Sequence, residues 1–431
     1  MVELLIAMAV GLFLVGGIIQ LLVSSKASYR VGEAEARAQE NGRFAVQMIA
    51  AGLRAARGTG CRSEILDQAQ ESLNVVACDL LDPSAGATGC VGAPAIGPDR
   101  PLGYSASEGG TAGLAGLSGN DTDSTYGAQY TVGRQWLRGD LIVSWGADGE
   151  GVYAALPPPA QDSDRTRPVE LVTRDKHLIG GRLALISDCE ATDIFMITTP
   201  RTCQADDSSP PDPLAHDVTY AGDASPQDCG TGASSGYEAG SQVNSDGALS
   251  RAYNRAGTET SPGATLRARV FPFEYSVFYV CCIDRRDGSV QEGAAVGNCK
   301  DTPDWYRPGL CRWSTSTNPR VQELVSDVAD LRVIYDGDAD PGSGTRFLDL
   351  PGVTPDAAWV SQRGYWDRVD SARVQVLATT AEEVRTEAAV PAPDASDPTD
   401  LGYGLAADRR IYQSFDVTVA TRSSSPWFVR R

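Results

Sequence analysis

Residues 2–23, VELLIAMAVGLFLVGGIIQLLV, form an apolar run with a single ionised side chain, Glu3, near its start. From Leu4 to Val23 no side chain carries a charge. As a helix this length spans roughly 30 Å, which is enough for the hydrocarbon core of a bilayer. A secretory signal peptide would need a basic segment before the run and a small-residue cleavage site after it. Here no basic residue precedes the run, and the segment continues without a break into more helix. The sequence therefore predicts a membrane-spanning helix over residues 1–25.

The same helix is predicted to continue through residues 26–57 as an amphipathic segment. Its apolar positions recur at spacings of three, four and seven, which is the period of a helix with one buried face. They are Ala34, Ala38, Ala45, Met48, Ile49, Leu53 and Ala56. We expect one helix from about residue 3 to residue 57, roughly 80 Å long. Its first half belongs in a membrane or a bundle of its own kind, and its second half lies on a globular domain.

Two features of the apolar half have more than one interpretation. Glu3 is either a carboxylate in the headgroup region or the partner of a positive charge in a low-dielectric environment. The glycines Gly11, Gly16 and Gly17 each cost about 1 kcal/mol against alanine in a helix interior. They indicate either close packing between helices or a segment that can stretch or melt.

Composition and charge limit the partners of the remaining chain. The 431 residues carry 37 basic and 56 acidic side chains, a formal net charge of −19 that would repel a phosphate backbone, so nucleic acid is an unlikely partner. Ten cysteines occur without a CxxC pair, and only two histidines could join them at a zinc ion. Disulfides in an oxidising compartment are the better interpretation, and buried free thiols are the alternative. Lys26 and Arg30 follow the apolar run, and the positive-inside rule alone would place the next domain in the cytoplasm; the cysteines favour the periplasm.

Residues 58–431 are predicted to form a β-rich domain, so that the fold class is α+β. Candidate strands with alternating or β-prone sequence span 140–145, 169–173, 182–187, 193–198, 274–282, 331–335, 371–378 and 415–420. In the strand over 371–378, Ala372, Val374 and Val376 should face the core while Arg373 and Gln375 face solvent. Residues 321–330 predict a short amphipathic helix. Long polar insertions at about 104–128, 203–265 and 381–410 predict loops or partly disordered segments.

The cysteines fall into three local sets along the chain. Cys281 and Cys282 are adjacent on a predicted strand, so their side chains point to opposite faces and a bridge between them would be strained. We expect their partners to be Cys299 and Cys311. The other two sets are Cys61, Cys78 and Cys90, and Cys189, Cys203 and Cys229. Because a set of three cannot close internally, at least one bridge joins two sets, and the connectivity stays open.

One acidic turn raises the question of a metal ion. Asp336, Asp338 and Asp340 alternate in YDGDADPGSG, the spacing with which calcium loops present oxygen ligands. Pro341 stands where such a loop needs glycine, and no glutamate follows at the expected distance, so a plain acidic turn is the main alternative. No other cofactor is indicated. The sequence contains no GxSxG, HExxH or phosphate-loop motif, and we expect no enzymatic activity.

Two segments together resemble a known family. The apolar run VELLIAMAVGLFLVGG (2–17) and the helical run AEARAQENGRFAVQMI (34–49) resemble the N-terminus of type IV pilins. In those proteins a leader peptide is removed, and the mature chain begins with a methylated phenylalanine four residues before a glutamate that Glu3 matches. The resemblance implies that Met1 corresponds to the third mature residue, and that Glu3 pairs with the N-terminal amine of an adjacent subunit.

The order of five further segments is similar to that in the PilW class of minor pilins. These segments are LRGDLIVSWG (137–146), SDCEATDIFMIT (187–198), EYSVFYVCCIDRRDGSVQ (274–291), residues 310–338 and residues 366–383. The resemblance implies a pilin-like fold and a structural role in the assembly-priming and tip complex needed for pilus biogenesis, twitching and adhesion. It implies an inner-membrane anchor with a periplasmic domain, and later a place at the pilus tip.

The implied partners are other minor pilins, the major pilin, the inner-membrane assembly machinery and a tip adhesin. Two alternatives stay open. One is a minor pseudopilin of a type II secretion system, whose N-terminus would look much the same. The other is a tip-exposed module that binds a surface, a cell or DNA through the long insertions.

Overall fold

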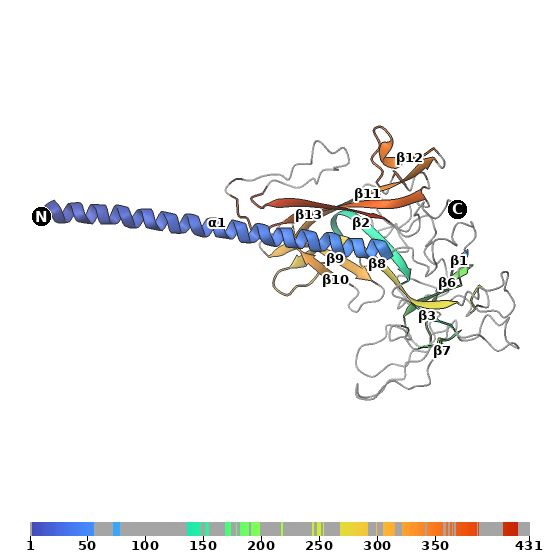
Figure 1. The fold of residues 1–431 in the computed structure, drawn as a ribbon. Helices are drawn as coiled ribbons and strands as arrows, with labels where there is room; N and C mark the ends of the chain where they lie inside the picture. Colours follow the sequence, from blue (N-terminus) through green and yellow to red (C-terminus); the bar gives the residue numbers. More distant parts are fainter. Residues whose placement is uncertain are drawn as a thin grey trace, which may run out of the picture.

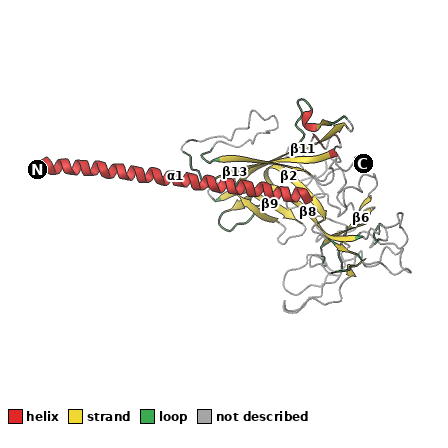
Figure 2. Ribbon diagram, in the orientation of Figure 1, coloured by secondary structure: helices red, strands yellow, loops and turns green. Residues whose placement is uncertain are grey.

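The protein is described from a computed structural model. The described residues are 2–55, 72–77, 136–147, 151–154, 169–173, 182–188, 191–198, 217–218, 248–250, 268–291, 305–314, 321–340, 343–356, 368–385 and 408–420, with isolated residues between these ranges. Within them one long helix and a set of β-strands form an α+β structure (Figures 1 and 2). The insertion at 104–128 and most of the insertions at 203–265 and 381–410 lie outside the described residues.

The helix α1 (Val2–Ala55) runs without interruption for 54 residues. Its N-terminal half projects away from the rest of the molecule, and its C-terminal part lies against the strands (Figure 1). The predicted buried stripe is confirmed at Ala38, Ala45, Ile49 and Leu53, which are at most 1% exposed. The long apolar and amphipathic halves therefore form a single rod, as the sequence indicates.

The strand β8 (Arg269–Asp284) organises the first sheet. Its first residues pair with β5 and β3, and its remaining residues pair with β2 and β9, all antiparallel. Along the described chain the order is β1-β6-β5-β8-β9-β10, with β2 and β3 also paired to β8. The bounds are β1 Ser72–Val75, β2 Trp136–Ala147, β3 Val152–Tyr153, β5 Leu183–Ser187, β6 Ala191–Met196, β9 Tyr306–Ser314 and β10 Val321–Ser326. A separate short pair joins β4 (Val169–Glu170) to β7 (Asp217–Val218).

The second sheet has the order β12-β11-β13-β14. Its strands are β11 (Val328–Asp340), β12 (Thr345–Arg346), β13 (Val369–Thr379) and β14 (Tyr412–Ala420), and the short 3-10 helix η4 (Phe347–Asp349) follows β12. The chain passes from the first sheet to the second at Asp327, between β10 and β11. The two sheets are thus joined by continuous backbone.

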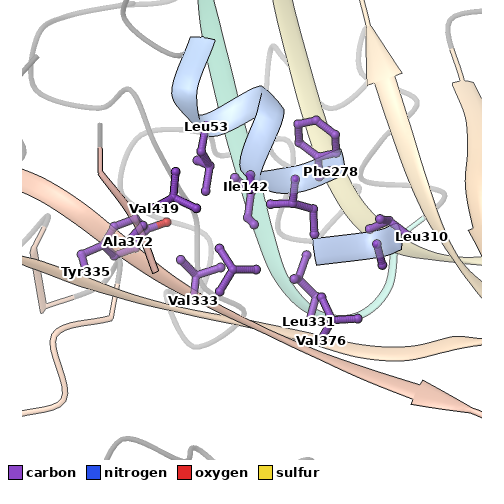
Figure 3. Close-up of a cluster of buried hydrophobic side chains, with 14 of the residues drawn as sticks. Leu53, Ile142, Phe278, Leu310, Leu331, Val333, Tyr335, Ala372, Val376 and Val419 are labelled. Atoms are coloured by element: carbon purple, nitrogen blue, oxygen red, sulfur yellow. The ribbon is translucent and has the colours of Figure 1, made fainter. Parts of the chain in front are cut away.

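Alternation along the strands separates the apolar side chains into distinct clusters. On β8, Val277 and Tyr279 face one cluster within the first sheet, whereas Phe278 and Val280 face α1. We call the second cluster the helix core: it combines residues of α1, of the first sheet and of the second sheet, and Figure 3 shows Leu53 among side chains from both sheets. A third cluster lies on the other face of β5 and β6. The helix core is where all three layers meet.

The predicted helix over 321–330 is wrong, because residues Val321–Ser326 form β10. The strand pairs antiparallel with β9, and its register shifts between Glu323 and Val325. A β-bulge adds a residue and breaks the period of two. Together with the bend at Asp327 it produces apolar spacings of three and four that imitate a helix.

The predicted faces of β13 are mostly confirmed. Ala372, Val374 and Val376 are fully buried in the helix core. The prediction that Gln375 faces solvent is wrong, because its residue is only 4% exposed. β13 is an inner strand, and Gln375 lies between Arg332 of β11 and Asp416 of β14 in the register, so neighbours on both sides shield it.

Candidate functional site: the exposed half of the N-terminal helix and its seat

The N-terminal half of α1 exposes its apolar side chains all round. The described large apolar residues of this half are 53–87% exposed, from Val2 at 71% to Val23 at 64%. Monomeric soluble proteins rarely expose a contiguous apolar surface of this extent. By length and composition α1 can cross a membrane, and it is the single such helix among the described residues. This half is therefore consistent with a helix that anchors the chain in a membrane.

The residues singled out in the apolar half lie on the open surface of this rod. Glu3 is exposed in the first turn of α1, where a carboxylate complements the positive end of the helix dipole. Gly11, Gly16 and Gly17 lie within unbroken helix, and a Cβ atom added at any of them would meet nothing within 4 Å. The space beside these glycines is therefore open to a neighbouring helix. Pairing of Glu3 and melting at the glycines stay predictions.

Polar contacts fasten the second half of α1 to both sheets. Gln413 of β14 donates from Nε2 to Glu35 Oε1 at 3.1 Å. Asn41 donates from Nδ2 to the Ser326 carbonyl at 3.0 Å, at the end of β10. The Ser144 hydroxyl of β2 donates to the Gly52 carbonyl at 2.8 Å, one of the last carbonyls of α1, which lack intrahelical partners. These bonds fix the rotation of the helix about its axis and its position along the strands.

Two glycines allow the helix to approach the sheets closely. A Cβ atom at Gly42 would lie 2.1 Å from ring carbons of Phe415 on β14. A Cβ atom at Gly52 would lie 2.7 Å from ring carbons of Phe278 on β8. Sequence reasoning missed both glycines because it traced only apolar positions. Gly42 falls at the stripe spacing between Ala38 and Ala45, and this position could have identified it.

Two disulfides reinforce the first sheet, against which the second half of α1 packs. Cys281 is bonded to Cys311 of β9, and Cys282 is bonded to Cys299. Cys281 and Cys311 belong to the cluster that faces away from α1, so the adjacent cysteines point to opposite faces of β8. These are the partners that the sequence indicated. The other six, Cys61, Cys78, Cys90, Cys189, Cys203 and Cys229, lie outside the described residues.

The acidic turn is engaged in ion pairs of its own. Arg346 donates from Nη2 to Asp336 Oδ2 at 2.8 Å, and its guanidinium also pairs with Asp370. Asp338 Oδ1 accepts from the Asp340 backbone at 3.1 Å. No group of three or more His, Cys, Asp or Glu side chains that could hold a metal ion is found in the described part of the chain. The Arg346 guanidinium thus already pairs with the Asp336 carboxylate. Calcium binding stays a prediction, and no cluster of metal ligands among the described residues supports it.

No protein-family model, curated protein or solved structure matches this chain. The helix, its contacts with the sheets and the domain that it carries are therefore the features that bear on its function. What the described arrangement offers chemically is the exposed apolar surface of the N-terminal half of α1.

Proposed function

We propose that this chain is a minor pilin of a type IV pilus: a non-enzymatic subunit of the complex that primes pilus assembly and sits at the filament tip. In this proposal α1 anchors the chain in the inner membrane with the domain in the periplasm. The same helix later packs among helices of other minor pilins and the major pilin in the filament. The assembly machinery of the inner membrane would move it from one environment to the other.

The observation that carries the proposal is the division of α1 into two environments. Its first half exposes apolar surface in every direction, while Ile49 and Leu53 of its last turns are fully buried in the domain. Such a helix suits both a bilayer and a bundle of similar helices, because both environments cover apolar surface and exclude water. The resemblance of residues 2–17 and 34–49 to type IV pilins favours a bundle formed by the N-terminal helices of pilin subunits.

Glu3 gives the proposal its sharpest test. Glu3→Ala should leave membrane insertion intact. A carboxylate at the edge of the bilayer raises the free energy of insertion only slightly, and its removal lowers that free energy. The variant should sharply reduce incorporation into pili, because an opposite charge on an adjacent subunit would lose its partner in a low-dielectric core. The measurement is the number of surface pili and the twitching zone in a host that lacks its own copy of the chain.

Glu40→Ala is the matched control, since Glu40 is an exposed carboxylate on the same helix but outside the apolar half. It should leave piliation unchanged. Normal piliation with Glu3→Ala would contradict the pairing. If removal of the whole chain stops protein secretion but leaves pili intact, the chain is a pseudopilin of a secretion system instead.

A further inference from the structure

A short basic segment of α1 follows directly after the apolar run. Lys26 and Arg30 lie one helical turn apart and are exposed, and Tyr29 between them is 72% exposed. Among the described residues neither basic side chain forms an ion pair, and Glu33, the next carboxylate along the helix, pairs with Arg37 at 2.6 Å. We call Lys26, Tyr29 and Arg30 the basic collar.

The basic collar stands at the level where the hydrocarbon core of a bilayer would end. If α1 crosses the bilayer with Val23 at the edge of the hydrocarbon, Lys26 lies about 4.5 Å above that edge and Arg30 about 10.5 Å above it. The headgroup layer is roughly 5–7 Å thick on each side. Side chains of a helix lean toward its N-terminus, so the long side chain of Arg30 reaches back over the remaining ~4 Å. Both cationic groups therefore fall within the headgroup layer.

The described strands leave the collar uncovered. Every residue from 21 to 30 is exposed. Glu35, which accepts a hydrogen bond from Gln413 of β14, lies a further turn along the helix from Arg30. The collar is thus open to the medium that surrounds the helix at this level.

We propose that the basic collar binds anionic phospholipid in the leaflet next to the domain. Phosphate oxygens accept charge-assisted hydrogen bonds from ammonium and guanidinium groups, and basic residues beside a membrane helix are attracted to anionic headgroups. A tyrosine ring favours the same layer. Tyr29 therefore helps to hold the helix at the depth that keeps both cations among the phosphates.

The charge of the domain assigns any attraction to anionic lipid to the collar. Residues 1–57 carry six of the 37 basic and four of the 56 acidic side chains, which leaves residues 58–431 with a formal net charge of −21. An anionic surface repels such a domain, although salt screens the repulsion beyond about 8 Å. The attraction must then come from the few cations that lie within the headgroup layer.

The inference rests on α1 crossing a bilayer, which is part of the proposed function, and it does not depend on pilus assembly. In the test, the full chain in a non-ionic detergent is titrated with phosphatidylglycerol and, separately, with phosphatidylcholine of the same acyl chains. Native mass spectrometry measures the Kd of each lipid. Because both lipids carry a phosphate, the ratio of the two Kd values reports the effect of the net charge of the headgroup.

The wild-type chain should bind phosphatidylglycerol about tenfold more tightly than phosphatidylcholine. Lys26→Gln combined with Arg30→Gln should abolish this preference. The matched control combines Arg43→Gln with Arg54→Gln, which removes the same charge from exposed positions of the same helix. Since Arg43 lies about 30 Å beyond Val23, the control should keep the tenfold preference.

Three results would overturn the inference and leave the proposed function standing: a wild-type chain without a preference, a preference that survives in the collar variant, or equal losses in the two variants. In the first case the collar would be free to pair with carboxylates of a neighbouring protein. Flotation with vesicles is measured in parallel, and a wild-type chain that does not insert would contradict both the inference and the proposed anchor. Equal near-ultraviolet circular dichroism verifies that each variant is folded.

Discussion

At residue 327 the chain leaves the first sheet with a left-handed backbone, φ 57°. The Asp327 backbone donates to the Pro308 carbonyl at 3.0 Å and accepts from the Thr379 amide at 2.8 Å, so this one residue joins β9 to β13. The whole residue is only 9% exposed. Burial raises the pKa of Asp327, although Arg307, Arg285 and Arg410 act in the opposite direction and Glu323 adds to the rise. Burial therefore disfavours the charged form of this carboxyl at the junction.

Asp327→Asn should raise the free energy of unfolding at neutral pH, because asparagine also tolerates a left-handed backbone and has no charge to desolvate. A raised folded-state pKa means that the wild-type carboxyl contributes most below its unfolded pKa and loses that contribution as the pH rises through the folded pKa. The advantage of the variant should thus shrink when the pH falls from about 7 to about 4. Thermal unfolding of the detergent-solubilised chain at both pH values measures it.

Asp287→Asn supplies the matched control for this titration. The Ser289 backbone and side chain lower the pKa of Asp287, which is exposed, so the pH dependence has the opposite sign. The control should lose a little stability at neutral pH and none at low pH. An Asp327→Asn effect of equal size at both pH values would contradict the role given to burial.

At the scale of elements, the contact between α1 and β14 depends on the absence of a side chain at Gly42. A methyl group there would lie 2.1 Å from the Phe415 ring, so either the helix or the strand must shift. Gly42→Ala should lower the free energy of unfolding by about 1–3 kcal/mol, as overpacked cores do. Denaturant unfolding followed by near-ultraviolet circular dichroism provides the measurement.

Gly32→Ala tests the same substitution on the same helix without the contact. Nothing lies within 4 Å of a Cβ atom at Gly32, so the gain in helix propensity should appear alone, about 0.5–1 kcal/mol of stabilisation. If both variants are stabilised alike, α1 does not rest on β14 as described. Gly42→Ala combined with Phe415→Ala should recover part of the loss, because the two residues share one space.

Sequence patterns predict the faces of an element best where its apolar period is regular. α1 and β13 repeat their apolar residues regularly, and most of their predicted faces are confirmed at Ala45, Leu53 and Val374. β10 was predicted as a helix because a bulge and the bend at Asp327 replace its period of two by helical spacings. The exposure of Gln375 was predicted wrongly because alternation identifies which face of a strand a side chain is on, but not whether other elements cover that face. Close approaches such as Gly42 to Phe415 join residues far apart in the chain, and no local pattern contains them.

At the scale of the whole molecule, the helix core makes α1 part of the domain rather than a tether to it. Residues of both sheets converge on Ala45, Ile49, Ala50 and Leu53. Figure 3 shows Leu53 among side chains of both sheets. Burying an Ile or a Leu side chain contributes about 1.5–3 kcal/mol each, so the last turns of the helix supply much of what joins the two sheets. The exposed half of α1 adds nothing to this core. The molecule therefore divides within the helix, and the point of division precedes Glu35, which accepts a hydrogen bond from Gln413 of β14.

Two truncations test this division. A chain that begins at Ala27 keeps the hydrogen bonds of Glu35, Asn41 and Gly52 to the strands. It should be soluble, with the same near-ultraviolet circular dichroism and thermal midpoint as the full chain in detergent. A chain that begins at residue 56 loses the four helix side chains of the helix core and should aggregate or unfold, since it exposes apolar faces of both sheets. Because the two differ only in residues 27–55, a stable fold for the shorter chain would mean that the sheets pack without the helix, and the helix would then be a tether after all.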